Sequence, residues 1–164
     1  MTLTPHDLEI LRRGLQLRLN ARGEFFCEGD AVTHPRVVAW LRRGLDRHEG
    51  GGHVIRAGEQ WAYIAVDDTP LRVRGVESDE DDTLWCDLDD GRRVRLDVTT
   101  LVESERGVHC EVPSVPTGRP LRARLSNPAQ MQLHDRLRWT DDRARPLVWS
   151  SERGAWIEIP FAPA

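Results

Sequence analysis

The sequence contains no lysine, few cysteines and no long apolar segment. All 23 basic residues are arginines, the chain has 27 acidic residues, and its formal net charge is -4. This balance lacks the cationic excess with which general DNA-binding domains neutralise phosphates. The use of arginine alone is typical of a GC-rich bacterial genome rather than of a functional demand. No apolar run approaches the roughly 20 residues that a membrane helix needs.

The sequence also lacks the patterns of common metal and catalytic sites. Cys27, Cys86 and Cys110 are odd in number and show no C-x-x-C spacing, which argues against a disulfide framework or a structural zinc site. The six histidines are scattered, and neither a P-loop nor the GxGxxG, HExxH or GxSxG pattern occurs. We therefore expect no metal, no cofactor and no catalytic residue that a sequence motif defines. A catalytic triad whose residues are distant in the sequence stays an open alternative.

The chain nevertheless has the composition of a folded protein. Of its 164 residues, 39% are hydrophobic and 30% are charged, which suits one good core or two small units. The first residues, Met1–Pro5, show neither the basic segment nor the apolar core of an export signal. These features predict a protein of the cytoplasm that neither spans a membrane nor binds DNA in general.

Turn residues and periodicity predict the elements of the first part of the chain. A helix of about ten residues begins at Pro5, and the turn at Asn20–Gly23 joins two strand-like segments into a hairpin. A second helix opens at Pro35 and keeps Leu41 and Leu45 on one apolar face. The other strands expected here are 53–56, 59–66 and 71–76.

The second part of the chain opens with an acidic segment. Residues 77–90 include eight acidic residues and no basic one, so we expect 78–82 to form a solvated loop and a joint between two halves. The Asp90-Gly91 pair predicts a hairpin turn between strands 84–88 and 93–98.

The remaining segments repeat this mixture of hairpins and helices. Residues 107–112 form one more expected strand, and 121–125 are ambiguous between strand and helix. Asn127 followed by Pro128 predicts an N-cap and a helix that reaches about Arg138. The expected terminal hairpin joins 147–150 to 155–159. Hairpins, a helix and further strands in both halves hint at an internal duplication.

Two groups of charged residues are candidates for a binding site. The carboxylates of Glu59, Asp67 and Asp68 could bind a cation, pair with arginines or accept hydrogen bonds from a ligand. The same residues could instead form a strand-end turn in which Asp68 caps backbone N–H groups.

The second group consists of Arg119, Arg122 and Arg124. Their planar guanidinium groups could bind phosphate by paired hydrogen bonds, or they could simply cover a solvated face. The tryptophans fit core or edge anchors better than base-stacking platforms.

Two segments carry a resemblance to a known family. Residues 20–32 contain a glycine, then aromatic residues and then a Glu-Gly pair ahead of the expected amphipathic helix, and this order is similar to a motif of the family. Residues 59–70 start with a glutamate and end in Asp-x-Pro, which is similar to a strand-and-turn motif of the same family. With residues 84–101, 120–137 and 148–159 following in order, the chain resembles the bacterial domain-of-unknown-function family 1285 (DUF1285).

This resemblance implies an α+β chain of two structurally related halves, 1–76 and 77–164, each of hairpins and antiparallel strands with packed helices. The second half would be pleckstrin-homology-like. It also implies a non-enzymatic signalling protein with a nucleotide-type ligand at the interface of the halves, which Glu59 and Asp68 would face. The chain departs from the family at Ala57-Gly58 and in an insertion at 113–119.

The sequence and the resemblance together lead to three hypotheses. The first is a ligand-sensing or signalling module that binds a small anionic, nucleotide-like molecule. Glu59 and Asp68 would hold its amino or hydroxyl groups, and Arg122 with Arg124 its anionic group. The second is a protein-interaction adaptor without a small ligand, which uses an exposed sheet and tryptophans to bind a protein partner. The third is a hydrolytic enzyme.

Overall fold

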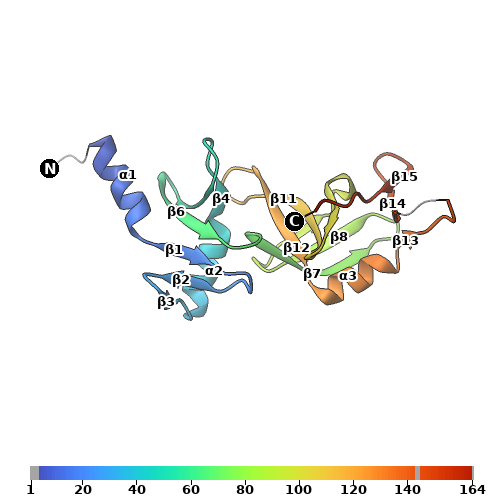
Figure 1. Cartoon of the computed structure of the whole chain (residues 1–164), viewed down its shortest axis with the longest axis horizontal. Coiled ribbons are helices and arrows are strands. Elements are labelled where there is room, and N and C mark those ends of the chain that lie inside the picture. Colours follow the sequence, from blue (N-terminus) through green and yellow to red (C-terminus); the bar gives the residue numbers. More distant parts are fainter. Residues whose placement is uncertain (1–3, 143–144, 164) are drawn as a thin grey trace. The chain divides into compact units, whose positions relative to one another are not determined.

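The computed structural model describes residues 4–142 and 145–163, which form two compact units (Figure 1). Unit 1 is Met1–Pro70 with Pro113–Leu121, and unit 2 is Leu71–Val112 with Arg122–Ala164. The units therefore divide at Pro70, six residues before the end of the predicted first half, and the 113–121 segment returns to unit 1. Each unit contains a six-stranded sheet, so the predicted α+β fold of two related halves is confirmed.

Unit 1 combines a mixed sheet with two helices in its described part. The strand order is β3-β2-β1-β6-β5-β4, and every neighbouring pair except β1 and β6 is antiparallel. The elements are α1 (Pro5–Gly14), β1 (Leu17–Leu19), β2 (Phe25–Cys27), β3 (Asp30–Ala31), α2 (Pro35–Gly44), β4 (Leu45–Arg47), β5 (His53–Ala57) and β6 (Gln60–Val66).

Unit 2 combines a second six-stranded sheet, of order β10-β11-β12-β7-β8-β9, with a three-stranded sheet of order β13-β14-β15. Its elements are β7 (Leu71–Ser78), β8 (Leu84–Leu88), β9 (Arg93–Arg95), a 3-10 turn η1 (Val98–Thr100), β10 (Val102–Ser104), β11 (Gly107–Pro113), β12 (Pro120–Leu125), α3 (Asn127–His134), β13 (Leu137–Arg138), β14 (Leu147–Ser150) and β15 (Ala155–Glu158). Among the described residues of both units, no helix is long and apolar enough to cross a membrane.

The two six-stranded sheets share one path of the chain. Each starts at a central strand, runs outward, crosses to the opposite edge and returns to the centre, so its first and last strands pair in parallel. Both parallel pairs end alike, since Asp67 N–H donates to Leu19 C=O at 3.0 Å and Ser126 N–H donates to Val73 C=O at 2.9 Å. The repetition expected from the sequence is therefore present in the topology.

The helix α2 ends earlier than its apolar pattern predicts. The apolar pattern places Leu45 on the face of this helix, but α2 stops at Gly44 and Leu45 starts strand β4 opposite Ile55. A side chain at Gly44 would have its Cβ 2.9 Å from the Arg56 carbonyl oxygen. Glycine therefore allows the close approach of helix end and sheet, and Leu45 is buried by β-pairing instead of helix packing.

The segment before α3 resolves as a strand. Alternation buries Leu121 and Leu125 on one face of β12, which settles the ambiguity between strand and helix. The expected N-cap at Asn127 is wrong by one residue, because the Ser126 hydroxyl accepts a hydrogen bond from Ala129 N–H at 3.3 Å. The helix ends at His134, short of the expected end, since β13 follows almost at once.

The C-terminal segment covers the edge strand β10. Glu103 N–H donates to Pro160 C=O and Ala162 N–H donates to Glu103 C=O, each at 2.9 Å, and Phe161 forms an isolated parallel bridge with Glu103. Edge strands carry unpaired backbone groups that invite pairing with other chains. Residues 160–162 satisfy part of that edge within the chain.

The three cysteines differ in accessibility, and this predicts their reactivity. Cys86 and Cys110 are buried, and a hydrogen bond with the Cys86 thiol, together with burial, raises the pKa of the Cys110 thiol. Cys27 is partly exposed on β2. We expect iodoacetamide at neutral pH to label the folded protein once, at Cys27, and the urea-unfolded protein three times, as read by intact mass and peptide mapping. Rapid labelling of Cys86 in the folded chain would contradict this burial.

Candidate functional site

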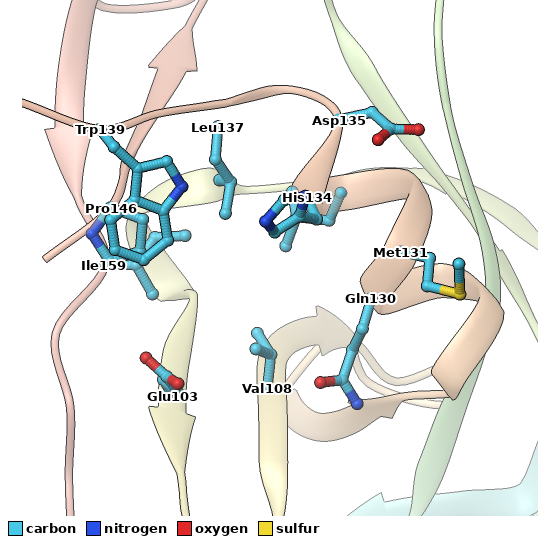
Figure 2. Close-up of a pocket in the computed structure, with 11 residues that line it drawn as sticks. Glu103, Val108, Gln130, Met131, His134, Asp135, Leu137, Trp139, Pro146 and Ile159 are labelled. Atoms are coloured by element: carbon cyan, nitrogen blue, oxygen red, sulfur yellow. The ribbon is translucent and has the colours of Figure 1, made fainter.

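Unit 2 contains a pocket of about 380 Å³ beside helix α3 (Figure 2). Its walls are mainly apolar, and its polar side chains come from β10, α3 and the residue that follows α3. Small-molecule sites have this character, because apolar walls provide affinity and a few polar groups fix the orientation. The apolar part of the lining includes Val108, Leu137, Trp139, Pro146 and Ile159.

Helix α3 is held along the pocket by a cap at its start and by the packing of its buried face. Ser126 caps the helix, and Leu133 buries its side chain against the unit 2 core. The Gln130 amide donates to Leu125 C=O at 3.0 Å, which fixes this side chain as part of the wall. In Figure 2, His134 points across the hollow toward Trp139, whereas Asp135 points away from it.

Glu103 brings a carboxylate to the side of the pocket opposite α3. Its Oε2 forms an ion pair with Arg145, and its backbone is held by the C-terminal segment. Within the described part of the chain, Oε1 of Glu103 accepts no hydrogen bond. The pocket is therefore a mainly apolar hollow in which the Glu103 carboxylate is a charged acceptor that can receive a hydrogen bond from a ligand.

Trp139 adds a large, exposed side chain to the lining of the same pocket. It is 56% exposed, although it directly follows the short strand β13. Exposure of so much indole in a pocket wall offers a face on which a flat molecule can stack. In chemical terms the arrangement can bind and orient an aromatic molecule that carries an N–H or O–H group.

The predicted acidic group does not converge within unit 1. Glu59 lies in the exposed turn before β6, and Asp67 follows the end of the same strand. The seven residues of β6 separate them, which at about 3.3 Å per residue places them roughly 25 Å apart. Asp68 is half-buried in the bend after Asp67.

Asp67 has a structural partner in the neighbouring strand. Arg18 donates from Nε to Oδ1 at 3.0 Å and from Nη2 to Oδ2 at 2.6 Å. The hydrogen bond from Arg18 lowers the pKa of the Asp67 carboxyl, and the same contact raises the pKa of Arg18. This paired geometry ties the end of β6 to β1, and it is the pairing with an arginine that the sequence left open for this acidic group.

The three candidate arginines divide between the units. Arg119 belongs to unit 1, where it donates to Arg47 C=O at 2.9 Å and to Glu49 at 2.8 Å. Arg122 and Arg124 lie two residues apart on β12 and therefore share one face of the strand. Arg124 donates to Gly107 C=O at 3.3 Å, and Arg122 is exposed.

A buried cluster in unit 1 was missed by sequence reasoning. Asp46 on β4 is fully buried and accepts hydrogen bonds from Ser114, Thr117 and Arg56. The hydroxyls lie on the 113–119 insertion, so this carboxylate anchors the insertion to its own unit. No sequence pattern marks Asp46, because its partners are distant in the chain.

The pocket residues were also not singled out from the sequence. Glu103 lies outside every recognised pattern, His134 belongs to a scattered set, and Trp139 fits a core or edge anchor. The available signal was the Ser-Asn-Pro start of α3, which predicts a helix but not what lies beside it. Among the described residues, no group of three or more histidine, cysteine or acidic side chains is arranged to hold a metal ion.

The comparisons with known proteins identify the fold but no activity. No family model matches the chain, and no protein of curated function does. The structure is similar to that of a DUF1285 family protein from Silicibacter pomeroyi DSS-3, with a TM-score of 0.67 and 20% identity over 88% of this chain and 79% of that chain. It is also similar to a DUF1285 family protein from Shewanella baltica OS155, with a TM-score of 0.58 and 16% identity over 73% of this chain and 90% of that chain. The chain thus has the fold of DUF1285 family proteins, as its sequence resemblance predicted.

Proposed function

We propose that this protein is a non-enzymatic ligand-sensing module and that the pocket beside α3 binds a flat heteroaromatic molecule with N–H donors. The observation that carries the proposal is that one pocket is lined both by Glu103, whose Oε1 accepts no hydrogen bond from the described residues, and by the largely exposed Trp139. A nucleobase is the natural member of this ligand class, because its ring can stack on indole and its amino or imino groups can donate to the carboxylate.

Size and lining support a small ligand. The hollow of about 380 Å³ lies within the usual range of small-molecule sites, and it is large enough for a nucleoside. Its described lining contains no serine, threonine or cysteine that could act as a nucleophile next to His134. It also contains no arginine, so the base and not the phosphate of a nucleotide would account for recognition here.

Isothermal titration with adenosine, guanosine, cytidine and uridine tests the proposal. We expect at least one nucleoside to bind, and Trp139→Ala to weaken this binding by about 10-fold or more, in line with roughly 1–3 kcal/mol for base stacking. Glu103→Gln should weaken it by about 10-fold, because the charged acceptor is lost while the shape is kept. The matched control is Glu105→Gln, which removes an exposed carboxylate from the turn after β10 and should leave binding unchanged.

The outcome also separates the alternatives. Binding of AMP with unchanged affinity relative to adenosine supports recognition through the base. Much tighter binding of AMP, lost in Arg122→Ala, would instead favour the anionic, nucleotide-like ligand predicted with Glu59, Asp67, Asp68, Arg119, Arg122 and Arg124. No heat and no thermal shift with any of these compounds at millimolar concentration would overturn the pocket proposal.

A further inference from the structure

Unit 1 contains a second hollow, which the proposed nucleoside site does not use. It has a volume of about 460 Å³ and lies between α2 and the β1, β2, β5 and β6 strands, next to the end of α1. We call it the α2 groove, and its lining includes Arg12, Leu15, Cys27, Trp40 and Trp61.

The α2 groove exposes large apolar side chains from different elements. Trp40 on α2 is 54% exposed, and Leu15, which follows α1, is 48% exposed. Val37, which is not part of the groove lining, is exposed on α2 one helical turn before Trp40. Single exposed apolar residues are ordinary, but several around one hollow mark a place where a partner buries them.

Arg12 is the only charged residue in the described lining of the groove. The Arg12 guanidinium lies 4.0 Å from the centre of the Trp61 ring, which is a stacked cation–π arrangement that leaves its N–H edge open to a carboxylate. No described lining residue is acidic. On α2, Arg36 and Arg43 are exposed, and the first turn of the helix has no acidic residue.

We propose that the α2 groove docks an acidic amphipathic peptide segment of a protein partner. Apolar anchors of the peptide would cover Trp40 and Leu15, and its carboxylates would meet Arg12 and the exposed arginines of α2. Charge complementarity selects the acidic class, because a basic segment would bring like charges together at the rim. The open run of apolar side chains from more than one element suits side chains of a peptide, which approach from outside, better than an enclosed small molecule.

A random 12-residue peptide library displayed on phage and selected against the full chain tests this inference. We expect the enriched peptides to combine aromatic or aliphatic residues with aspartate or glutamate. A synthetic copy of the most enriched peptide should slow alkylation of Cys27, which is the partly exposed thiol in the groove. Trp40→Ala should weaken its binding by about 30-fold, as expected for an anchoring tryptophan.

The charge requirement has its own variants. Arg12→Glu should weaken binding of the acidic peptide by about 10-fold, whereas Arg22→Glu, an exposed arginine in the β1–β2 turn, should change it by less than about 2-fold. Selection of peptides without an acidic bias, or binding that leaves Cys27 labelling unchanged, would overturn the proposal. Protection of Cys27 by decanoate but by no peptide would overturn it as well and would assign the groove to a small amphiphile. Failure of the nucleoside titration does not affect these results, since that pocket lies in unit 2.

Discussion

Replacing Asp46 by alanine is expected to lower the free energy of unfolding by about 3–5 kcal/mol, the range for breaking a buried ion pair by removing one partner. Asp46 is 0% exposed, and its Oδ2 accepts from Arg56 Nε at 2.6 Å. Its Oδ1 accepts from the hydroxyls of Ser114 and Thr117, each at 2.7 Å. The variant would leave a guanidinium and two hydroxyls without their acceptor and would release the 113–119 segment.

Urea denaturation followed by tryptophan fluorescence measures this loss. The matched control is Asp67→Ala, because Asp67 also pairs with an arginine but is exposed. Exposed ion pairs contribute little, so the control should be far milder. Equal losses in the two variants would contradict the assigned role of the buried cluster.

The pH dependence of stability provides a second measurement of the same cluster. Burial alone would raise the pKa of the Asp46 carboxyl, but hydrogen bonds from Ser114, Thr117, the Arg47 N–H and Arg56 outweigh burial and lower it below the ordinary 3.8. A carboxyl whose pKa is lower in the folded state stabilises the protein above the unfolded value. This contribution is fully present above about pH 5 and is lost as the pH falls below 3.8 toward the folded pKa. Asp46→Ala should therefore flatten the acid limb of the stability curve.

Phe25→Ala is expected to cost about 3–5 kcal/mol, the usual range for deleting a buried aromatic ring. Phe25 is buried on β2 opposite the fully buried Leu19, which lies on the central strand β1 of the unit 1 sheet. The Arg42 guanidinium lies 5.5 Å from the centre of its ring and also donates to Gly23 C=O at 2.9 Å. Loss of the ring would open a cavity and remove the surface that positions Arg42.

The adjacent residue offers a control of the same chemistry. Phe26 follows Phe25 on β2, points to the opposite face of the sheet and is only partly buried. Phe26→Ala should therefore lower the unfolding free energy clearly less than Phe25→Ala in the same urea titration. A larger loss for Phe26→Ala would show that the core lies on the other face of β2.

Local patterns predicted much of the fold because the features involved are short-range. The Asn20–Gly23 turn, the Pro35 helix start and the Asp90-Gly91 turn were each recognisable within a few residues, and each forms as expected. By contrast, the short strands β4 and β10 were not predicted. They form because a neighbouring strand offers unpaired backbone groups, which no local pattern contains.

The candidate site was less predictable for the same physical reason. Glu103 reaches the pocket from an edge strand, and Trp139 reaches it from the chain beyond α3. Only the folded sheet brings them together, just as only the fold joins Asp46 to Ser114, 68 residues later. Conversely, Glu59 and Asp67 are near in sequence, yet the rigid strand between them keeps them apart.

The pairing of residues 160–162 with β10 has a practical consequence for handling the protein. Deleting these residues, or displacing them with a bulky C-terminal fusion, would expose the backbone of β10 to pairing with another molecule. It would also disturb the backbone of Glu103, and with it the acceptor of the proposed pocket. An affinity tag is therefore better placed at the other end of the chain, where it leaves the pairing of residues 160–162 with β10 intact. A loss of ligand binding in a variant can then be assigned to the variant and not to the tag.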